Sequence, residues 1–233
     1  MRMIGLVLLL FSAPLWALEF ASTNQRTTVI ELYTSEGCSS CPPADRWVSS
    51  LRNDPRVFKG LLPLVFHVDY WDGLGWKDPY ASKAYSQRQY ALVQEAILSQ
   101  AYTPGIVVDS QEWRQWFRGQ RDLKTTGQSA NILSVALQDK LLTAEYDTDK
   151  AYILNVAYLG MGLQTNVLAG ENRGRQLQHD FVVLSHQQRS GQQRWQLQLD
   201  SIPDKGQQQT ALAVWLTPLD SLQIIQAAGS LLE

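Results

Sequence analysis

Two cysteines are the residues whose type and spacing point most clearly to chemistry. Cys38 and Cys41 are the only cysteines among the 233 residues, and two serines separate them. The thiolate of one can attack a disulfide while its neighbour resolves the mixed product. A disulfide across so short a loop stabilises a fold by only about 2 kcal/mol, which favours redox use over a structural staple. We therefore predict Cys38 as the nucleophile and Cys41 as the resolving thiol.

The segments on either side of the cysteines predict the elements that position them. Residues 28–33 are β-branched and aromatic, which is typical of a buried strand ending just before the cysteine turn. Apolar residues then recur at helical spacing over 44–51. A second apolar run, 61–68, predicts another buried strand, so the order indicates a right-handed parallel βαβ unit with the cysteines between strand and helix.

The immediate neighbours of the cysteines make this an atypical pair. A helix N-terminus lowers the pKa of a nearby thiol because its amides and dipole stabilise the thiolate. Pro42 and Pro43 lack amide hydrogens and are expected to delay or kink the helix. Glu36, if it faces the sulfur, would raise the pKa of Cys38 by charge repulsion.

The elements that follow continue the order of a thioredoxin-like domain. Residues 78–99 predict a long helix that Asp78 caps, and 105–109 predict a third strand. Thr103 and Pro104 precede that strand, where thioredoxin-like folds place a cis proline beside the dithiol. We expect Thr103 and Pro104 to shape the groove in which a substrate would lie.

Two polar residues at the end of the second strand are candidates for proton transfer. His67 and Asp69 lie where parallel sheets usually place their sites, and either could move a proton for Cys41. The alternative is that His67 is a buried strand residue with one hydrogen bond and Asp69 caps the loop. We expect no metal or organic cofactor, with copper held by Cys38, Cys41 and His67 as the alternative, since soft thiolates and imidazole suit that metal.

From residue 128 onward the chain changes character. Glutamine becomes frequent, and short apolar runs alternate with turns, which favours a β-rich, sandwich-like domain. The expected fold class is thus an α/β thioredoxin-like domain over 18–127, a central mixed sheet flanked by helices, followed by a β-rich domain over 128–233. The predicted strands of that second domain cover 132–137, 141–146, 152–159, 181–184, 195–199 and 211–216.

The N-terminus predicts export. Residues 1–17 combine a positive charge, an apolar run over 4–11 and small residues near Ala17, which is typical of a signal peptide cleaved after that residue. We therefore expect a periplasmic or secreted protein, where disulfides persist, with protein thiols or disulfides as partners. No later segment is long and apolar enough to span a membrane, and a net charge of -2 offers no reason to expect nucleic acid as a partner.

Several stretches of the chain are specific in combination, namely residues 31–45, 67–72, 75–76, 102–104 and 170–175. Taken together they resemble the bacterial family of exported proteins known as domain of unknown function 1223. The resemblance implies a thioredoxin-like first domain and a β-rich second domain, and it brings no established substrate or activity.

Three functions follow from these observations. The leading one is an exported thiol-disulfide oxidoreductase that uses the Cys-Ser-Ser-Cys pair. The second is a copper-binding, copper-chaperone-like protein, and the third is a non-catalytic interaction protein with an inert disulfide. The direction of electron flow depends on how strongly the reduced form is stabilised, which the sequence does not set.

Overall fold

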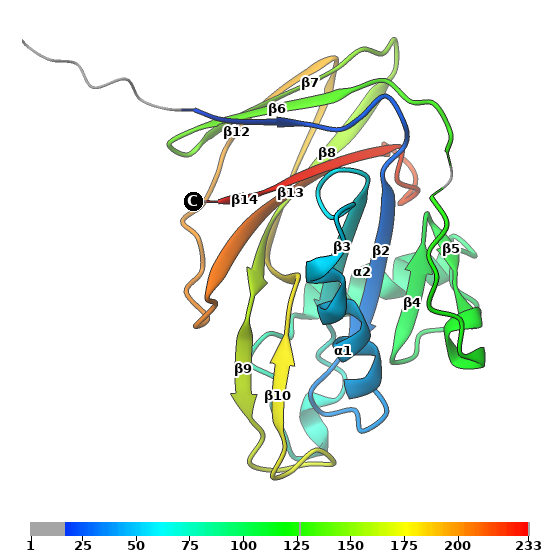
Figure 1. Ribbon diagram of the computed structural model, residues 1–233, viewed down its shortest axis with the longest axis vertical. Helices are drawn as coiled ribbons and strands as arrows, with labels where there is room; N and C mark the ends of the chain where they lie inside the picture. Colours follow the sequence, from blue (N-terminus) through cyan, green and yellow to red (C-terminus); the bar gives the residue numbers. More distant parts are fainter. Residues whose placement is uncertain (1–16, 126, 233) are drawn as a thin grey trace, which may run out of the picture.

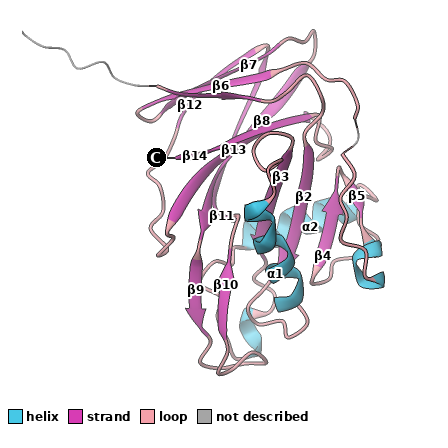
Figure 2. Cartoon of the chain, viewed as in Figure 1, coloured by secondary structure: helices cyan, strands magenta, loops and turns pink. Residues whose placement is uncertain are grey.

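The computed structural model describes residues 17–125 and 127–232, and strands dominate it (Figures 1 and 2). Within those ranges the two α-helices are α1 (Pro42–Ser50) and α2 (Lys83–Gln94). Twelve strands form one continuous sheet, and β9 and β10 form a separate hairpin. The strands are β1 (Leu18–Ala21), β2 (Thr28–Thr34), β3 (Leu61–His67), β4 (Gly105–Val108), β5 (Gln111–Glu112), β6 (Leu133–Gln138), β7 (Leu141–Tyr146), β8 (Ala151–Met161), β9 (Leu163–Asn166), β10 (Gln176–His179), β11 (Val182–Gln192), β12 (Arg194–Gln198), β13 (Gln209–Pro218) and β14 (Gln226–Leu232).

Strands β2 and β3 form the centre of the lower part of the molecule in Figure 1. They pair in parallel along their whole length, as the sequence predicts, and β4 pairs antiparallel with β2. Because side chains alternate across a strand, Ile30 and Leu32 pack with α1 on one face. Tyr33 and Phe66 pack with α2 on the other face. The two helices thus cover opposite faces of these strands.

The upper part of Figure 1 consists of two layers of strands. Strands β1, β6, β7 and β12 pair in that order, and β8, β13 and β14 pair in the other layer. Their inner faces share one apolar core, in which Leu142 and Trp195 from the first layer meet Leu154 and Leu212 from the second. The alternating apolar residues of this half of the chain supply that core.

The expected fold class is wrong. An α/β thioredoxin-like domain followed by a separate β-rich domain would require two independent sheets, whereas one sheet runs through both halves of the chain. Strand β11 pairs in parallel with β3 at Val182 and Val65, and β1 pairs with β6. These pairings join segments far apart in the sequence, so local apolar patterns carry no information about them. The result is a mostly β protein.

Other expectations have separate outcomes. The domain boundary near residue 127 stays a prediction, and the signal peptide, apart from Ala17, lies outside the described residues. None of the described helices is long and apolar enough to cross a membrane.

The helix predicted over 78–99 is shorter, because Ser82 caps its start by accepting a hydrogen bond from the Ala84 amide. Asp78 bonds to His67 and to the amides of Glu36 and Tyr80 instead.

A buried ion pair connects α2 to the sheet. Arg88 donates from Nε to Oε2 of Glu31 over 2.9 Å, and the Tyr33 hydroxyl donates to the same oxygen. Both charged side chains are almost wholly buried. The guanidinium also lies over the rings of Phe66 on β3 and Trp215 on β13. This contact therefore joins α2 to strands from both halves of the chain.

We predict that Arg88→Met lowers the free energy of unfolding by about 3–5 kcal/mol, because it leaves the Glu31 carboxylate buried without its counter-charge. Urea denaturation followed by circular dichroism measures the change. The control is Arg114→Met, which removes an ion pair with Glu112 at an exposed position and should change stability far less. Equal losses in the two variants would contradict the prediction.

Candidate functional site

The two cysteines form a disulfide at the start of α1. Cys38 and Cys41 are bonded with their Cα atoms 5.5 Å apart. Cys41 occupies the N-cap position, and its carbonyl accepts hydrogen bonds from the amides of Ala44 and Asp45. The helix begins directly at Pro42, so the expectation that the two prolines delay it is wrong. Proline suits these positions because the first helical amides have no partner within the helix.

The loop of the β9–β10 hairpin, residues 167–175, contacts the backbone of the cysteine turn. Both cysteines are completely buried, although Ser39 and Ser40 between them are exposed. Asn172 donates from Nδ2 to the carbonyl oxygens of Glu36 and Cys38, at 2.8 and 2.9 Å. Glu171 accepts a hydrogen bond from the Ser39 amide at 3.0 Å. The hairpin loop thus binds the backbone of the turn that carries Cys38.

The Glu36 carboxylate is hydrogen-bonded to Trp76 and His179, and its effect on the pKa of the Cys38 thiol stays a prediction. Its carboxylate is buried and accepts a hydrogen bond from Trp76 Nε1 at 2.8 Å. The other carboxylate oxygen lies 3.1 Å from Nε2 of His179 on β10. Its amide donates to Asp78. Glu36 is therefore hydrogen-bonded to three side chains, those of Trp76, Asp78 and His179.

One aromatic side chain, Trp71, connects Thr103 to the segment just before the cysteines. The peptide bond between Thr103 and Pro104 is cis, as the order of elements predicts. Thr103 Oγ1 accepts a hydrogen bond from Trp71 Nε1 at 2.9 Å. Trp71 in turn packs against Gly37, where any added Cβ would lie 2.9 Å from the Trp71 Cβ. Gly37 is therefore required by close packing, and the role of Thr103 and Pro104 in a substrate groove stays a prediction.

The proposed proton-transfer residues have other partners. His67 lies at the end of β3 and is bonded through Nδ1 to Oδ2 of Asp78 at 2.7 Å. Asp69 accepts a hydrogen bond from the Ser86 hydroxyl on α2. Neither side chain is hydrogen-bonded to Cys41, and proton transfer by them stays a prediction.

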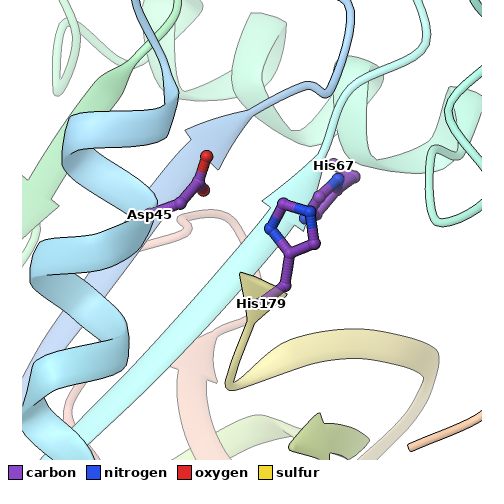
Figure 3. A group of neighbouring side chains, drawn as sticks. All are labelled: Asp45, His67 and His179. Atoms are coloured by element: carbon purple, nitrogen blue, oxygen red, sulfur yellow. The ribbon is translucent and has the colours of Figure 1, made fainter. Parts of the chain in front are cut away.

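A cluster of three buried side chains, Asp45, His67 and His179, lies beneath the same turn. Figure 3 shows the Asp45 carboxylate extending from α1 toward the imidazole rings at the end of β3 and on β10. Their potential ligand atoms all lie within 4.8 Å of one another. Among the described residues, no other group of three His, Cys, Asp or Glu side chains meets this criterion, and this one contains no cysteine. Copper binding by Cys38, Cys41 and His67 stays a prediction.

The charges around this cluster shift the pKa values of its members. Burial raises the pKa of the Asp45 carboxyl, against the opposing effects of His179 and His67. Burial acts to lower the pKa of His67, but Asp78, and after it Asp45 and Glu36, outweigh burial and raise it. For Asp78 the raising effect of burial is outweighed by His67, so its pKa is lowered. The surrounding carboxylates therefore favour the positively charged form of the His67 imidazole.

Sequence reasoning missed three of these residues. Asp45 and Asn172 lie inside the stretches 31–45 and 170–175 that carry the family resemblance. That resemblance was the one feature of the sequence that could have indicated a functional role for them. No sequence pattern indicated a role for His179, because it stands alone in the sequence and its partner Glu36 is 143 positions away. Only the fold brings that imidazole beneath the cysteine turn.

The fold and this site define a mostly β protein with a buried Cys-x-x-Cys disulfide at the start of a helix. The chain belongs to the family described as protein of unknown function DUF1223, which matches residues 29–217. No curated protein matches the sequence significantly.

Two solved structures are similar to this chain. One is the crystal structure of a structural genomics target from Agrobacterium tumefaciens, with a TM-score of 0.63, 23% identity, and coverage of 90% of this chain and 95% of that chain. The other is HBP35 of Porphyromonas gingivalis, with a TM-score of 0.53, 15% identity, and coverage of 90% of this chain and 76% of that chain. At these identities the likeness shows the fold alone.

We predict that Asn172→Ala lowers the free energy of unfolding by about 1–3 kcal/mol, because two buried carbonyl groups each lose a hydrogen bond from its side-chain amide. The matched control is Asn131→Ala, whose amide bonds to the Asp147 carbonyl at an exposed position. That control should change stability by no more than about 0.5 kcal/mol. Chemical denaturation of both variants measures the difference, and indistinguishable values would contradict the prediction.

Proposed function

We propose that this protein is a thiol-disulfide oxidoreductase of an exported compartment, acting through Cys38 and Cys41. The observation that carries the proposal is the disulfide itself, which joins the two cysteines across only two residues at the first turn of α1. A bond closing so short a loop contributes only about 2 kcal/mol to stability. Its reduction therefore removes little of the stability of the fold.

The proposed reaction is a reversible two-electron exchange with a protein thiol or disulfide. In the oxidative direction for the dithiol, the Cys38 thiolate attacks a partner disulfide, and one partner thiolate leaves. The Cys41 thiol then loses its proton and attacks the sulfur of Cys38, which releases the second partner thiolate. The Cys38–Cys41 disulfide forms while the partner disulfide becomes two thiols. The reverse sequence oxidises a partner dithiol.

The hydroxyl of Ser40 lies within hydrogen-bond distance of the Cys38 sulfur. Its oxygen lies 3.3 Å from Cys38 Sγ, and the bonded sulfur can only accept. Pro42 and Pro43 occupy the first two helical positions and supply no amide hydrogens there. We infer that Ser40 takes over part of the role that helix amides have elsewhere, because a hydrogen bond to a thiolate lowers its pKa.

The proposed reaction also requires that a partner reach the cysteine sulfurs. Cys38 and Cys41 are wholly buried, and Asn172 of the hairpin loop 167–175 donates a hydrogen bond to the Cys38 carbonyl. A reaction partner therefore reaches the sulfur only after this loop or the cysteine turn moves. The exposed Ser39 and Ser40 between the cysteines offer the surface that a partner contacts first.

We predict that Cys41→Ser, incubated with oxidised glutathione, accumulates a stable mixed disulfide at Cys38, because the resolving thiol is absent. Mass spectrometry of the intact protein and of its peptides measures the adduct. Cys38→Ser is the matched control and should accumulate far less adduct at Cys41. Failure of Cys41→Ser to form an adduct, with a wild-type disulfide that resists glutathione and dithiothreitol, would identify the bond as inert and overturn the proposal.

A second prediction concerns the serine hydroxyl. In the reduced protein, Ser40→Ala should raise the pKa of the Cys38 thiol and slow its alkylation at neutral pH several-fold, because the thiolate loses a donor. The pH dependence of thiolate ultraviolet absorbance and of the iodoacetamide reaction rate measure the two effects. Ser39→Ala, an exposed neighbour, should leave both unchanged, and equal effects from the two serines would contradict the assignment.

A further inference from the structure

Three unpartnered polar atoms meet beneath the cysteine turn. Oδ1 of Asp45, Nε2 of His67 and Nδ1 of His179 are each buried without a hydrogen-bond partner. A buried polar atom left in this state costs about 1–3 kcal/mol, and these three belong to one cluster, so a single bound ligand could satisfy them together. The three side chains come from α1, β3 and β10, and their potential ligand atoms lie within 4.8 Å of one another (Figure 3).

The other polar atom of each side chain is already held. His67 donates from Nδ1 to the Asp78 carboxylate, and His179 donates from Nε2 to the Glu36 carboxylate. The second oxygen of Asp45 accepts a hydrogen bond from Thr34. A carboxylate on the far nitrogen fixes the neutral tautomer whose free nitrogen carries a lone pair, which is the usual arrangement behind a metal-ligating histidine.

Charge in this region also calls for a cation. The carboxylates of Asp45, Asp78 and Glu36 surround two imidazoles, and all five side chains are buried. Burial of uncompensated negative charge is strongly unfavourable, so these carboxylates favour positive charge on or between the imidazoles, carried by a proton or by a metal ion. A divalent ion among the three free atoms would offset most of that charge while satisfying each atom.

From this geometry we propose that Asp45, His67 and His179 bind one divalent transition-metal ion, of which zinc is the representative. Zinc accepts both imidazole nitrogens and carboxylate oxygens, and three protein ligands leave a position for water or another small ligand. Bond lengths of about 2.0–2.2 Å require the three atoms to draw closer on binding, through small side-chain rotations.

A cavity of about 120 Å³ adjoins the cluster on the side of α1 and β10. Asp45 and His179 line it, together with Pro42, Arg46 and residues 176–178. It provides a route by which water or an ion reaches the buried ligands, which a metal site needs. The site is independent of the proposed redox function, because its ligands include no cysteine and it needs no change at the disulfide.

The test uses the full-length oxidised protein, in which both thiols are held in the disulfide. Titration with Zn²⁺ after chelator treatment should show one saturable site per chain by calorimetry. His67→Gln and His179→Gln should each weaken zinc binding by more than about 100-fold. Removing a residue that only hydrogen-bonds to a metal ligand typically weakens binding by about 10- to 100-fold. His186→Gln is the matched control, because this third histidine bonds to Asn155 outside the cluster, and it should bind as wild type does.

A measurement on the wild-type protein keeps the test decisive if the variants unfold. The chain has three histidines, so ¹⁵N NMR of the imidazoles can follow each one. Zn²⁺ should shift Nε2 of His67 and Nδ1 of His179 and leave both nitrogens of His186 unchanged. Absence of saturable binding, or binding that shifts neither of the first two rings, would overturn the proposal. Binding that appears only after reduction and disappears in Cys38→Ser would overturn it in favour of a thiolate site.

Discussion

The need to satisfy buried polar groups around Glu36 organises the functional end of this molecule. Its amide, its carbonyl and both carboxylate oxygens all have partners, namely Asp78, Asn172, Trp76 and His179. These partners come from a loop after β3 and from the β9–β10 hairpin. Because these groups are buried, each unmade hydrogen bond would cost about 1–3 kcal/mol, so the segments are held in one arrangement.

The same network lies beside both proposed chemistries. On one side, Asn172 holds the backbone at Cys38, next to the proposed redox pair. On the other side, Glu36 orients the His179 ring, which fixes the nitrogen that faces Asp45 and His67. One buried carboxylate thus lies between the proposed redox pair and the proposed metal ligands. A hairpin contributed by the second half of the chain completes both.

Local patterns were sufficient for the elements near the cysteines. Strands 28–34 and 61–67 and their parallel pairing follow from two apolar runs separated by a helix, since only a right-handed crossover joins them compactly. The fold class was wrong because strand pairing between β11 and β3, and between β1 and β6, joins distant segments. Short apolar runs of similar composition do not specify which partner each will find.

The sequence by itself determined that two cysteines stand three positions apart at the start of a helix, because residue type and spacing are local properties. It also indicated a cis bond before Pro104. The tertiary structure alone decided that His179 bonds to the Glu36 carboxylate and that it joins Asp45 and His67. Those contacts arise from hydrogen bonds between buried groups more than a hundred residues apart, whose energies depend on the surroundings that only the folded chain creates.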